Sequence, residues 1–322
     1  MDSGYLQTDM RAAVLHQYAT TPVVGDFDAP EEAAQGQVVL EVVAAGMNPV
    51  DRSIASGSFY AGSPTLPYVV GREGVARLGD GRLAYFNSAV APFGAFGQRV
   101  LVEQDALVSL PEGIEPAQAI ACGIAGSAAW LALTRRAQTR EGETVLVLGA
   151  GGVVGQVAIQ AARLLGAGRV VAAARSEQGL ELAARLGADA CVVIGSDRWQ
   201  EALIEAAAGP GYDVVIDPLW GEPAAAAVEA MAFGGRLVQI GQSAGPTALL
   251  GSGTIRGRML TIIGHTNLAA DSGLLREAYN EIVAHSARGD LTVAVKRASL
   301  DELPAVWESQ ANSPGHKLIV EF

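Results

Sequence analysis

The chain has 322 residues, of which 50% are hydrophobic and 17% are charged, and this composition predicts a globular protein of about two domains. Its formal net charge of -12 argues against nucleic acid or an anionic membrane as a partner of the whole surface, while leaving room for a local basic pocket that binds a phosphate. No basic N-terminal segment followed by an apolar core, and no apolar run of membrane-spanning length, is recognised, so we expect a cytoplasmic protein with a small-molecule substrate.

Cysteine and histidine are sparse. Cys122 and Cys191 lie in apolar, alanine-rich segments and are expected in the core, which excludes a disulfide framework and a four-cysteine zinc site. The four histidines are scattered, and none forms a helical pair at positions i and i+4. We therefore predict no metal site.

The first third of the chain has the texture of an antiparallel β domain. Residues 10–115 are rich in valine, glycine and proline. Strand-like runs occur at 38–44, 83–86 and 97–103.

Residues 144–175 are the most informative stretch, because they have the order strand, glycine turn, helix and strand. The strand at 144–148 is followed by Gly149, Gly152 and Gly155, which recur at every third position. Glycines there permit a tight turn, a close approach of the backbone to a pyrophosphate, and close packing of the following helix. The register is G-x-x-G-x-x-G rather than G-x-G-x-x-G.

The helix after this turn is expected to end near Gly166. Its first turn carries Val153 and Val154, and free amides at this end of a helix point toward phosphates. The turn and the helix together predict a site for a dinucleotide.

The second strand of this unit, at 169–174, ends beside Arg175 and Ser176. An acidic residue at this point would favour NAD, whereas an arginine and a hydroxyl suit the 2′-phosphate of NADPH. The alternative is that Arg175 is a solvated residue at a strand end and that the glycines are ordinary turn residues.

From about residue 115, helical segments rich in alanine alternate with short apolar strands, which predicts a doubly wound parallel sheet. The expected strands are 145–148, 169–174, 190–194, 213–216, 236–240 and 260–263. The loop after the fifth strand makes Gly241, Gln242 and Ser243 candidates for cofactor contact, although these residue types are also common in plain turns.

The tail has two helix-like segments, at 275–287 and 301–310, and a terminal strand at 317–322. We expect this strand to return to the β domain. The predicted organisation is then a β-rich domain in residues 1–115, a nucleotide-binding domain in 116–265, and a return to the first domain in 266–322.

At this point the chain resembles the medium-chain dehydrogenase/reductase superfamily, and within it the zinc-independent quinone oxidoreductase, or zeta-crystallin-like, branch. Motifs that carry the resemblance, besides the glycine turn, are VVAAGMNPVDRSIASGSFY (42–60), LPYVVGREGVARL (66–78), FGAFGQRVLV (93–102), ARLGAD (184–189), YDVVIDPLWG (212–221) and GGRLVQIGQSAG (234–245). The resemblance implies an α/β protein in which a GroES-like β domain is split by a Rossmann domain, and a homodimer.

The chain departs from the zinc alcohol dehydrogenases of this superfamily. They carry a cysteine ligand near the Asn48 region and Gly-His-Glu where this chain has Gly71, Arg72 and Glu73. Alcohol oxidation loses its usual mechanism without a Lewis acid, whereas hydride transfer to a conjugated acceptor needs only hydrogen-bond donors and a proton. The resemblance therefore implies an NADPH-dependent reductase of a quinone or an α,β-unsaturated carbonyl compound.

The resemblance also implies catalytic residues in the first domain. Asn48 lies where the family places a residue beside the nicotinamide and the substrate, Asp51 is a candidate for a polar network, and Tyr60 is a candidate proton donor. The alternative is that Asn48 forms a turn, Asp51 caps a short helix and Tyr60 only lines the cleft. The family's first tyrosine is replaced by Ser53.

Three further residues are placed near the cofactor by the same resemblance. Ser127 matches a small hydroxyl position, with ordinary helix packing as its other reading, and His265 and Asn267 follow the last expected strand. A lysine that relatives use for the 2′-phosphate would fall near Gly179, which leaves that contact to Arg175.

Two other functions fit the same sequence. One is a metal-free reductase of another carbonyl compound or of an enoyl thioester. The other is a non-catalytic protein that binds NADPH as a sensing or structural ligand, which the loss of tyrosine at Ser53 would suit.

Overall fold

The computed structural model describes residues 9–31 and 33–322, and the chain forms two compact units. The first unit runs to Ile124 and resumes at Ala294, and the second spans Ala125–Val293. These boundaries differ from the expected ones after residues 115 and 265. Helix α2 (Pro116–Ala121) packs on strands of the first unit, and helix α9 (Ser272–Ala287) packs on helix α3 (Ser127–Leu131) of the second.

The second unit is built on a parallel sheet of six strands in the order β11-β10-β9-β12-β13-β14. Its strands are β9 (Thr144–Leu148), β10 (Arg169–Ala174), β11 (Ala190–Val193), β12 (Tyr212–Asp217), β13 (Met231–Gln239) and β14 (Thr261–Gly264). The strand order reverses between β9 and β12, which is the point where doubly wound sheets bind ligands. The predicted α/β class with a Rossmann-like sheet is thereby confirmed.

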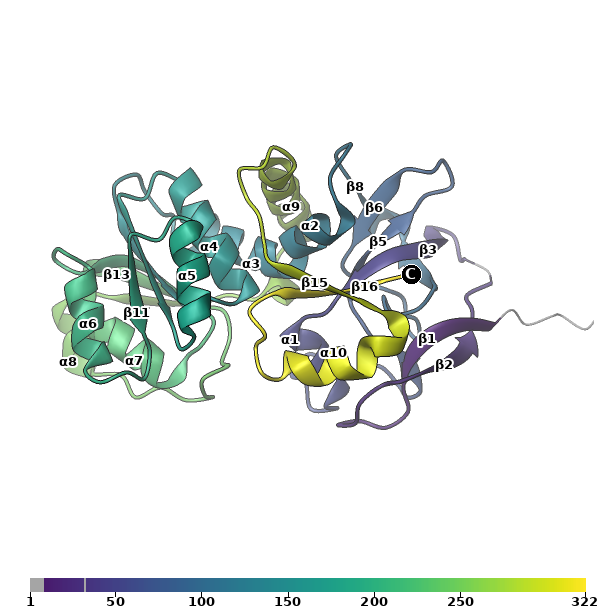
Figure 1. Ribbon diagram of the computed structural model, residues 1–322, viewed down its shortest axis with the longest axis horizontal. Coiled ribbons are helices and arrows are strands. Elements are labelled where there is room, and N and C mark those ends of the chain that lie inside the picture. The colour runs from purple at the N-terminus through teal and green to yellow at the C-terminus, as the bar shows by residue number, and fades with distance from the viewer. Residues whose placement is uncertain (1–8, 32) are drawn as a thin grey trace, which may run out of the picture. The chain divides into compact units, whose positions relative to one another are not determined.

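Helices cover both faces of this sheet, with α4 and α5 on one face and α6 and α7 on the other (Figure 1). Besides α3 and α9, the helices of this unit are α4 (Val153–Leu164), α5 (Glu177–Arg185), α6 (Trp199–Ala206), α7 (Gly221–Glu229), α8 (Ser252–Gly257) and the short turns Ala132–Arg136 and Asn267–Ala269. Because both faces are covered, the central strands read as continuous apolar runs: Val145 to Leu148 have no exposed surface.

The first unit contains two mostly antiparallel sheets. The larger has the order β15-β16-β3-β5-β6-β8, with β7 also paired to β3, and the smaller has the order β2-β1-β4. The strands are β1 (Asp9–Leu15), β2 (Val23–Asp28), β3 (Gln37–Gly46), β4 (Tyr68–Val69), β5 (Glu73–Arg77), β6 (Leu83–Phe86), β7 (Arg99–Glu103), β8 (Val108–Ser109), β15 (Val295–Ser299) and β16 (Lys317–Glu321).

The C-terminal strand returns to the β-rich unit, as the sequence predicts. Strand β16 pairs antiparallel with β3, with Ile319 opposite Gly46, and parallel with β15 (Figure 1). The remaining helices of the unit are α1 (Pro49–Ala55), α10 (Leu303–Gln310) and the short turns Gln104–Ala106, Cys122–Gly126 and Leu300–Glu302, of which Cys122–Gly126 crosses the unit boundary. Phe86, Phe96 and Leu318 are among the side chains that pack between these elements.

Two expectations are wrong in detail. The helical run Pro116–Arg136 is, by length and composition, apolar enough to cross a membrane, but 83% of its 18-residue window is buried inside the protein, as in a core helix. Cys122 is buried as expected, whereas Cys191 is exposed, because β11 is the edge strand of its sheet and only Val192 on that strand is fully buried.

Candidate functional site

Apart from Ser127, which lies in α3, the cofactor-binding residues expected in the second unit lie at one edge of the parallel sheet. Parallel strands end at the same edge, so Gly149 after β9, Arg175 after β10, Gly241 after β13 and His265 after β14 all lie at the carboxyl ends of strands. This is the edge at which ligands bind in doubly wound sheets.

The glycine turn between β9 and α4 is compact because it lacks side chains. Gly149 has a positive φ of 62°, and a Cβ on Gly155 would lie 2.5 Å from the Gly149 carbonyl oxygen. Gly152 is the N-cap of α4 in extended conformation and has no side chain to occupy the first amides of that helix. At the start of α4, the backbone amides of Val153 and Val154 therefore have no acceptor within the helix, as an anion site requires.

Arg175 and Ser176 follow β10. The Arg175 side chain is exposed and makes no hydrogen bond or ion pair with any residue that the structure describes. Ser176 is the N-cap of α5, where its hydroxyl oxygen accepts a hydrogen bond from the Gly179 amide at 3.2 Å. A Cβ on Gly179 would lie 3.0 Å from the Gly151 Cα, so the first turn of α5 packs directly on the glycine turn.

The loop after β12 supports the glycine turn from the other side. A Cβ on Gly149 would lie 3.0 Å from the Leu219 Cδ2 and 3.2 Å from the Pro218 Cγ. Asp217, the last residue of β12, holds this loop by accepting hydrogen bonds from the Leu219 and Trp220 amides through Oδ1, both at 2.8 Å. Sequence analysis included this segment in the motif YDVVIDPLWG but did not single out its carboxylate.

Asp217 is a buried carboxyl group with an incomplete set of partners. It has no exposed surface, and its Oδ2 has no hydrogen-bond partner among the described residues. Burial raises the pKa of Asp217 to about 6, and the two backbone donors oppose this shift only in part.

The Gly241–Ser243 loop is fastened to the same loop after β12. A Cβ on Gly241 would lie 2.8 Å from the Pro218 carbonyl oxygen, and the Ser243 hydroxyl donates to that oxygen at 3.3 Å. Gln242 is exposed. The structure thus gives Gly241 and Ser243 packing roles, and cofactor contact by the three residues stays a prediction.

His265, Asn267 and Ser127 are also found in the second unit. The His265 Nε2 lies 3.1 Å from the Asn267 Oδ1, and burial lowers the pKa of His265. Ser127 begins α3 and is buried, with 4% of its surface exposed. Their approach to the cofactor remains an expectation from the resemblance.

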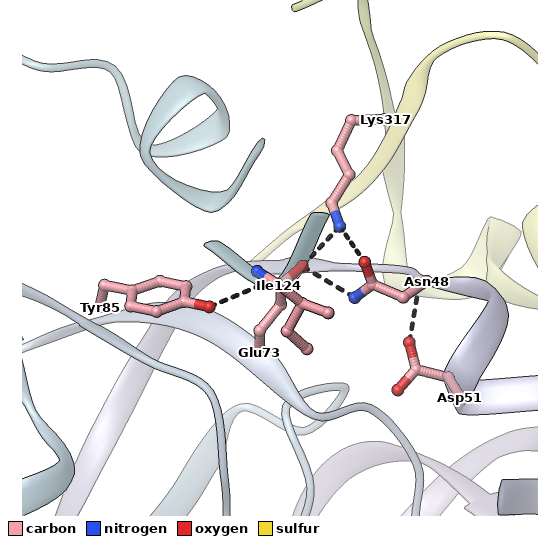
Figure 2. Close-up of polar contacts among 6 residues, drawn as sticks. All are labelled: Asn48, Asp51, Glu73, Tyr85, Ile124 and Lys317. Atoms are coloured by element: carbon pink, nitrogen blue, oxygen red, sulfur yellow. Dashed lines mark hydrogen bonds and ion pairs between the residues drawn. The ribbon is translucent and has the colours of Figure 1, made fainter. Parts of the chain in front are cut away.

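In the first unit, Asn48 belongs to a buried polar cluster (Figure 2). The Lys317 ammonium donates to the Asn48 Oδ1 at 2.7 Å and to the Glu73 Oε1 at 2.5 Å, and the Asn48 Nδ2 donates to the same Glu73 oxygen at 2.8 Å. All three side chains are at most 3% exposed.

The second oxygen of Glu73 is also fully engaged. Its Oε2 accepts from the Tyr85 hydroxyl and from the Ile124 amide, both at 2.7 Å (Figure 2). Gly123 makes this possible, because a Cβ at that position would lie 2.6 Å from the Tyr85 Cζ and would also overlap Glu73. Glu73 therefore gathers donors from four separate segments of the chain.

Sequence reasoning missed Glu73, Tyr85 and Lys317 as members of a site. One signal was available: Lys317 is one of only two lysines, against twenty arginines, and it begins an apolar strand. A single cation in a run of buried residues indicates a buried partner of opposite charge.

Asp51 lies beside this cluster and caps α1. Its Oδ2 accepts from the Asn48 amide at 2.7 Å, while its Oδ1 has no partner among the described residues. Burial raises the pKa of Asp51 to about 6; the Asn48 hydrogen bond and Lys317 oppose the shift, and Glu73 adds to it. The helix-cap reading of Asp51 describes this hydrogen bond, and its role in a polar network at the site stays a prediction.

Tyr60 differs from the cluster in its environment. Its side chain is 75% exposed, and its ring centroid is 4.5 Å from that of Phe59. The buried polar contacts around Asn48 are made by other residues, and a role of Tyr60 as proton donor stays a prediction.

The titration of Asp217 gives a testable dependence of stability on pH. Its pKa is higher in the folded chain than the ordinary value of 3.8, so the folded state binds more protons between pH 4 and 6. Stability is therefore lost as the pH rises through this window. Asp217→Asn should raise the free energy of unfolding by roughly 2 to 3 kcal/mol at pH 8 and by little at pH 4.

Urea unfolding followed by circular dichroism at both pH values measures this difference. Asp197→Asn is the matched control, because Asp197 is exposed in the same unit and its substitution should change neither curve. An Asp217→Asn variant that is less stable than the wild type at pH 8 would contradict the assignment.

The comparisons with known proteins agree with this geometry. A family model described as zinc-binding dehydrogenase matches residues 153–284. The quinone oxidoreductase of Rattus norvegicus is 32% identical over 215 residues, which cover 64% of each chain. A polyketide synthase subunit of Mycobacterium tuberculosis, named for phenolphthiocerol and phthiocerol, is 31% identical over 274 residues, which cover 80% of this chain and 12% of that protein. The chain thus spans less than two thirds of the length of either relative.

The zinc in the family model's description does not fit this chain. The positions of the missing ligands hold Asn48, whose amide is taken by Lys317 and Glu73, and Arg72, whose guanidinium donates to the Asn87 carbonyl oxygen at 3.4 Å. Structural and catalytic zinc sites use thiolate, imidazole or carboxylate ligands. Across residues 9–31 and 33–322, no three such side chains are grouped to hold a metal ion.

The structural comparison covers nearly the whole chain. The quinone oxidoreductase of Thermus thermophilus, which was also solved in complex with NADPH, is 31% identical and has a TM-score of 0.84. The match covers 97% of this chain and 100% of that one. By this match, by the likeness to the rat protein and by the misfit of zinc, the chain belongs to the medium-chain dehydrogenase/reductase superfamily, in its zinc-independent quinone oxidoreductase branch.

Proposed function

We propose that this protein is an NADPH-dependent, zinc-independent oxidoreductase that transfers hydride to a quinone or an α,β-unsaturated carbonyl compound. The observation that carries the proposal is the sheet edge of the second unit. There the glycine turn, the uncapped start of α4 and an unengaged Arg175 follow neighbouring strands β9 and β10.

The residues at this edge fit a phosphorylated dinucleotide. Gly149, Gly152 and Gly155 have no side chains, so a ligand can approach the backbone closely. The backbone amides of Val153 and Val154 suit the pyrophosphate. The exposed guanidinium of Arg175 suits the 2′-phosphate through charge-assisted hydrogen bonds. When bound, the nicotinamide would supply the hydride.

The comparisons support the cofactor and the reaction class. The Thermus thermophilus protein is named a quinone oxidoreductase and was solved with NADPH, and the rat protein carries the same name. Absence of fitting zinc ligands favours a conjugated acceptor, in which the electron pair displaced by hydride moves to an oxygen that hydrogen-bond donors stabilise.

Within the chain, we propose that Asn48 orients the acceptor or the nicotinamide, with Asp51 in the polar network behind it. Tyr60 is the proposed proton donor, and its exposed phenol is consistent with a residue that meets ligand or solvent. Protonation of the reduced acceptor then needs one proton from Tyr60 or from water.

An enoyl thioester is the second candidate acceptor. The match to a polyketide synthase subunit favours it, because such synthases build their products from thioester-linked intermediates and only 12% of that protein, a limited segment, corresponds to this chain. The chemistry is the same hydride transfer to the β-carbon of a conjugated carbonyl group.

The function is tested by stopped-flow oxidation of NADPH against quinones, enones and an enoyl thioester. We expect acceptor-dependent oxidation, faster with NADPH than with NADH. NADPH binding without turnover on any acceptor would reject the enzyme and favour a sensing or structural role for the cofactor.

The role of Arg175 is tested by its charge reversal. Arg175→Asp should weaken NADPH binding about 100-fold and NADH binding much less, because only NADPH carries the phosphate that the guanidinium would bind. Arg185→Asp, an exposed arginine at the end of α5, is the control and should leave both dissociation constants unchanged. Equal losses for the two cofactors in Arg175→Asp would show that it does not read the phosphate.

We also propose the homodimer that the resemblance implies. Strand β14 is the edge of its six-stranded sheet, pairs only with β13 among the described strands, and has three exposed residues of four. Such an edge is a template for a second chain.

Light scattering tests the homodimer and should give twice the chain mass of 33.1 kDa. Ile262→Pro on β14 should shift the measured mass to that of the monomer. A monomeric wild-type protein would reject the proposal. The cytoplasmic location stays a prediction.

A further inference from the structure

The buried cluster around Lys317 does more than fill a core. Lys317 is 1% exposed and Glu73 has no exposed surface, and burying two charges costs several kcal/mol per ion unless hydrogen bonds compensate. An apolar pair would fill this space at less cost. A charged pair retained there is therefore expected to hold something in a defined orientation.

The partners of Glu73 are complete, which fixes the carboxylate in place. Four donors share its two oxygens: Lys317 and Asn48 at Oε1, and Tyr85 and the Ile124 amide at Oε2. A carboxylate offers about four acceptor positions, and all four are used here. Rotation of the carboxylate would break several of these hydrogen bonds at once.

This arrangement determines which way the Asn48 amide points. Its oxygen faces the Lys317 ammonium and its nitrogen faces the Glu73 carboxylate (Figure 2). A flipped amide would direct two N–H donors at a cation and an oxygen at an anion, so the ion pair excludes it.

One donor of Asn48 is left over. Of its two Nδ2 hydrogens, one goes to Glu73, and the structure records no bond for the other within residues 9–31 and 33–322. The neighbouring ammonium polarises the amide through its oxygen, which makes the remaining N–H a stronger donor.

Two glycines make room for this cluster. A Cβ on Gly46 would lie 2.8 Å from the Lys317 Cε and 3.3 Å from the Glu73 Oε1. Gly123 clears the space for Tyr85 and Glu73 on the other side. Segments around residues 46, 73, 85, 123 and 317 thus fit one another at a single point.

We propose that Lys317 is a positioning residue: with Glu73 it locks the Asn48 amide so that one N–H is presented to the carbonyl oxygen of the acceptor. This inference rests on the proposed function. As hydride adds to the acceptor carbon, the displaced electron pair moves to the oxygen, and the Asn48 N–H donates to that oxygen. One proton from Tyr60 or from water then completes the reduced product.

The kinetic test compares Lys317→Ala with Lys296→Ala, the substitution of the chain's other lysine, which is exposed on β15. Lys317→Ala should lower kcat about 100-fold, as expected for a misplaced reacting group, with the dissociation constant of NADPH within about twofold of the wild type. Lys296→Ala should change neither quantity. Added propylamine should raise the kcat of Lys317→Ala at least about tenfold, because it supplies the missing ammonium. Propanol, which has a similar shape but no charge, should leave that kcat unchanged.

A second test reads the orientation of Asn48 without catalysis. The chain has five asparagines, so selective ¹⁵N labelling gives five side-chain amide pairs, and Asn48→Asp identifies the pair of Asn48. Its two protons should differ widely in chemical shift in the wild type, because only one faces a carboxylate. This difference should collapse in Lys317→Ala and in Glu73→Gln while the other four pairs stay in place.

The outcomes separate the two proposals. Wild-type protein without turnover on any acceptor rejects the proposed function, whereas Asn48 signals that are unchanged in Lys317→Ala reject the positioning role. A folded Lys317→Ala with wild-type kcat rejects it as well. If Lys317→Ala does not fold, Glu73→Gln, which keeps the side-chain shape, decides: unchanged Asn48 signals and unchanged kcat would overturn the proposal.

Discussion

A buried carboxylate that needs four donors organises the first unit. Glu73 has no exposed surface, and its donors come from β16, from the start of α1, from β6 and from the chain just before the second unit begins. Each of these segments must reach Glu73, because a missing donor leaves a charge in the core unpaired. Lys317 is the first residue of β16, so the pairing of this C-terminal strand with β3 also places Lys317 beside Glu73.

A second constraint, the direction of parallel strands, organises the other unit. Parallel pairing puts the loops after β9, β10, β12, β13 and β14 at one edge, and glycine lets these loops touch. Gly149 contacts the loop after β12, Gly241 contacts the same loop, and Gly151 meets Gly179. A side chain at these positions would push the loops apart, so one set of glycines both packs the edge and leaves backbone amides for phosphates.

Patterns local in the chain were readable from the sequence, and contacts that join distant segments were not. Apolar runs and glycine spacing predicted the parallel sheet, and the last segments were predicted as two helices and a strand. The pairing of Lys317 with Glu73, 244 residues apart, has no local signal beyond a lysine in an apolar strand. Asp217 likewise looked like a loop residue, because its burial depends on the loops that cover it. The unit boundaries shifted for the same reason, since packing of α2 and α9 decides them.

Position 317 holds one of the two lysines of the chain, and its ammonium makes two contacts from one atom. The chain uses arginine for twenty of its twenty-two basic side chains, so a general preference for arginine would place one here too. An arginine is a planar fork of five donors, whereas a lysine carries a compact ammonium on a flexible stem. The surroundings of Lys317 are closely packed, since a Cβ on Gly46 would lie 2.8 Å from the Lys317 Cε. A compact ammonium reaches the Asn48 Oδ1 and the Glu73 Oε1 at once from one nitrogen atom. The missing Cβ of Gly46 leaves space for the Lys317 side chain, and Lys317 and Glu73 together determine which way the Asn48 amide faces.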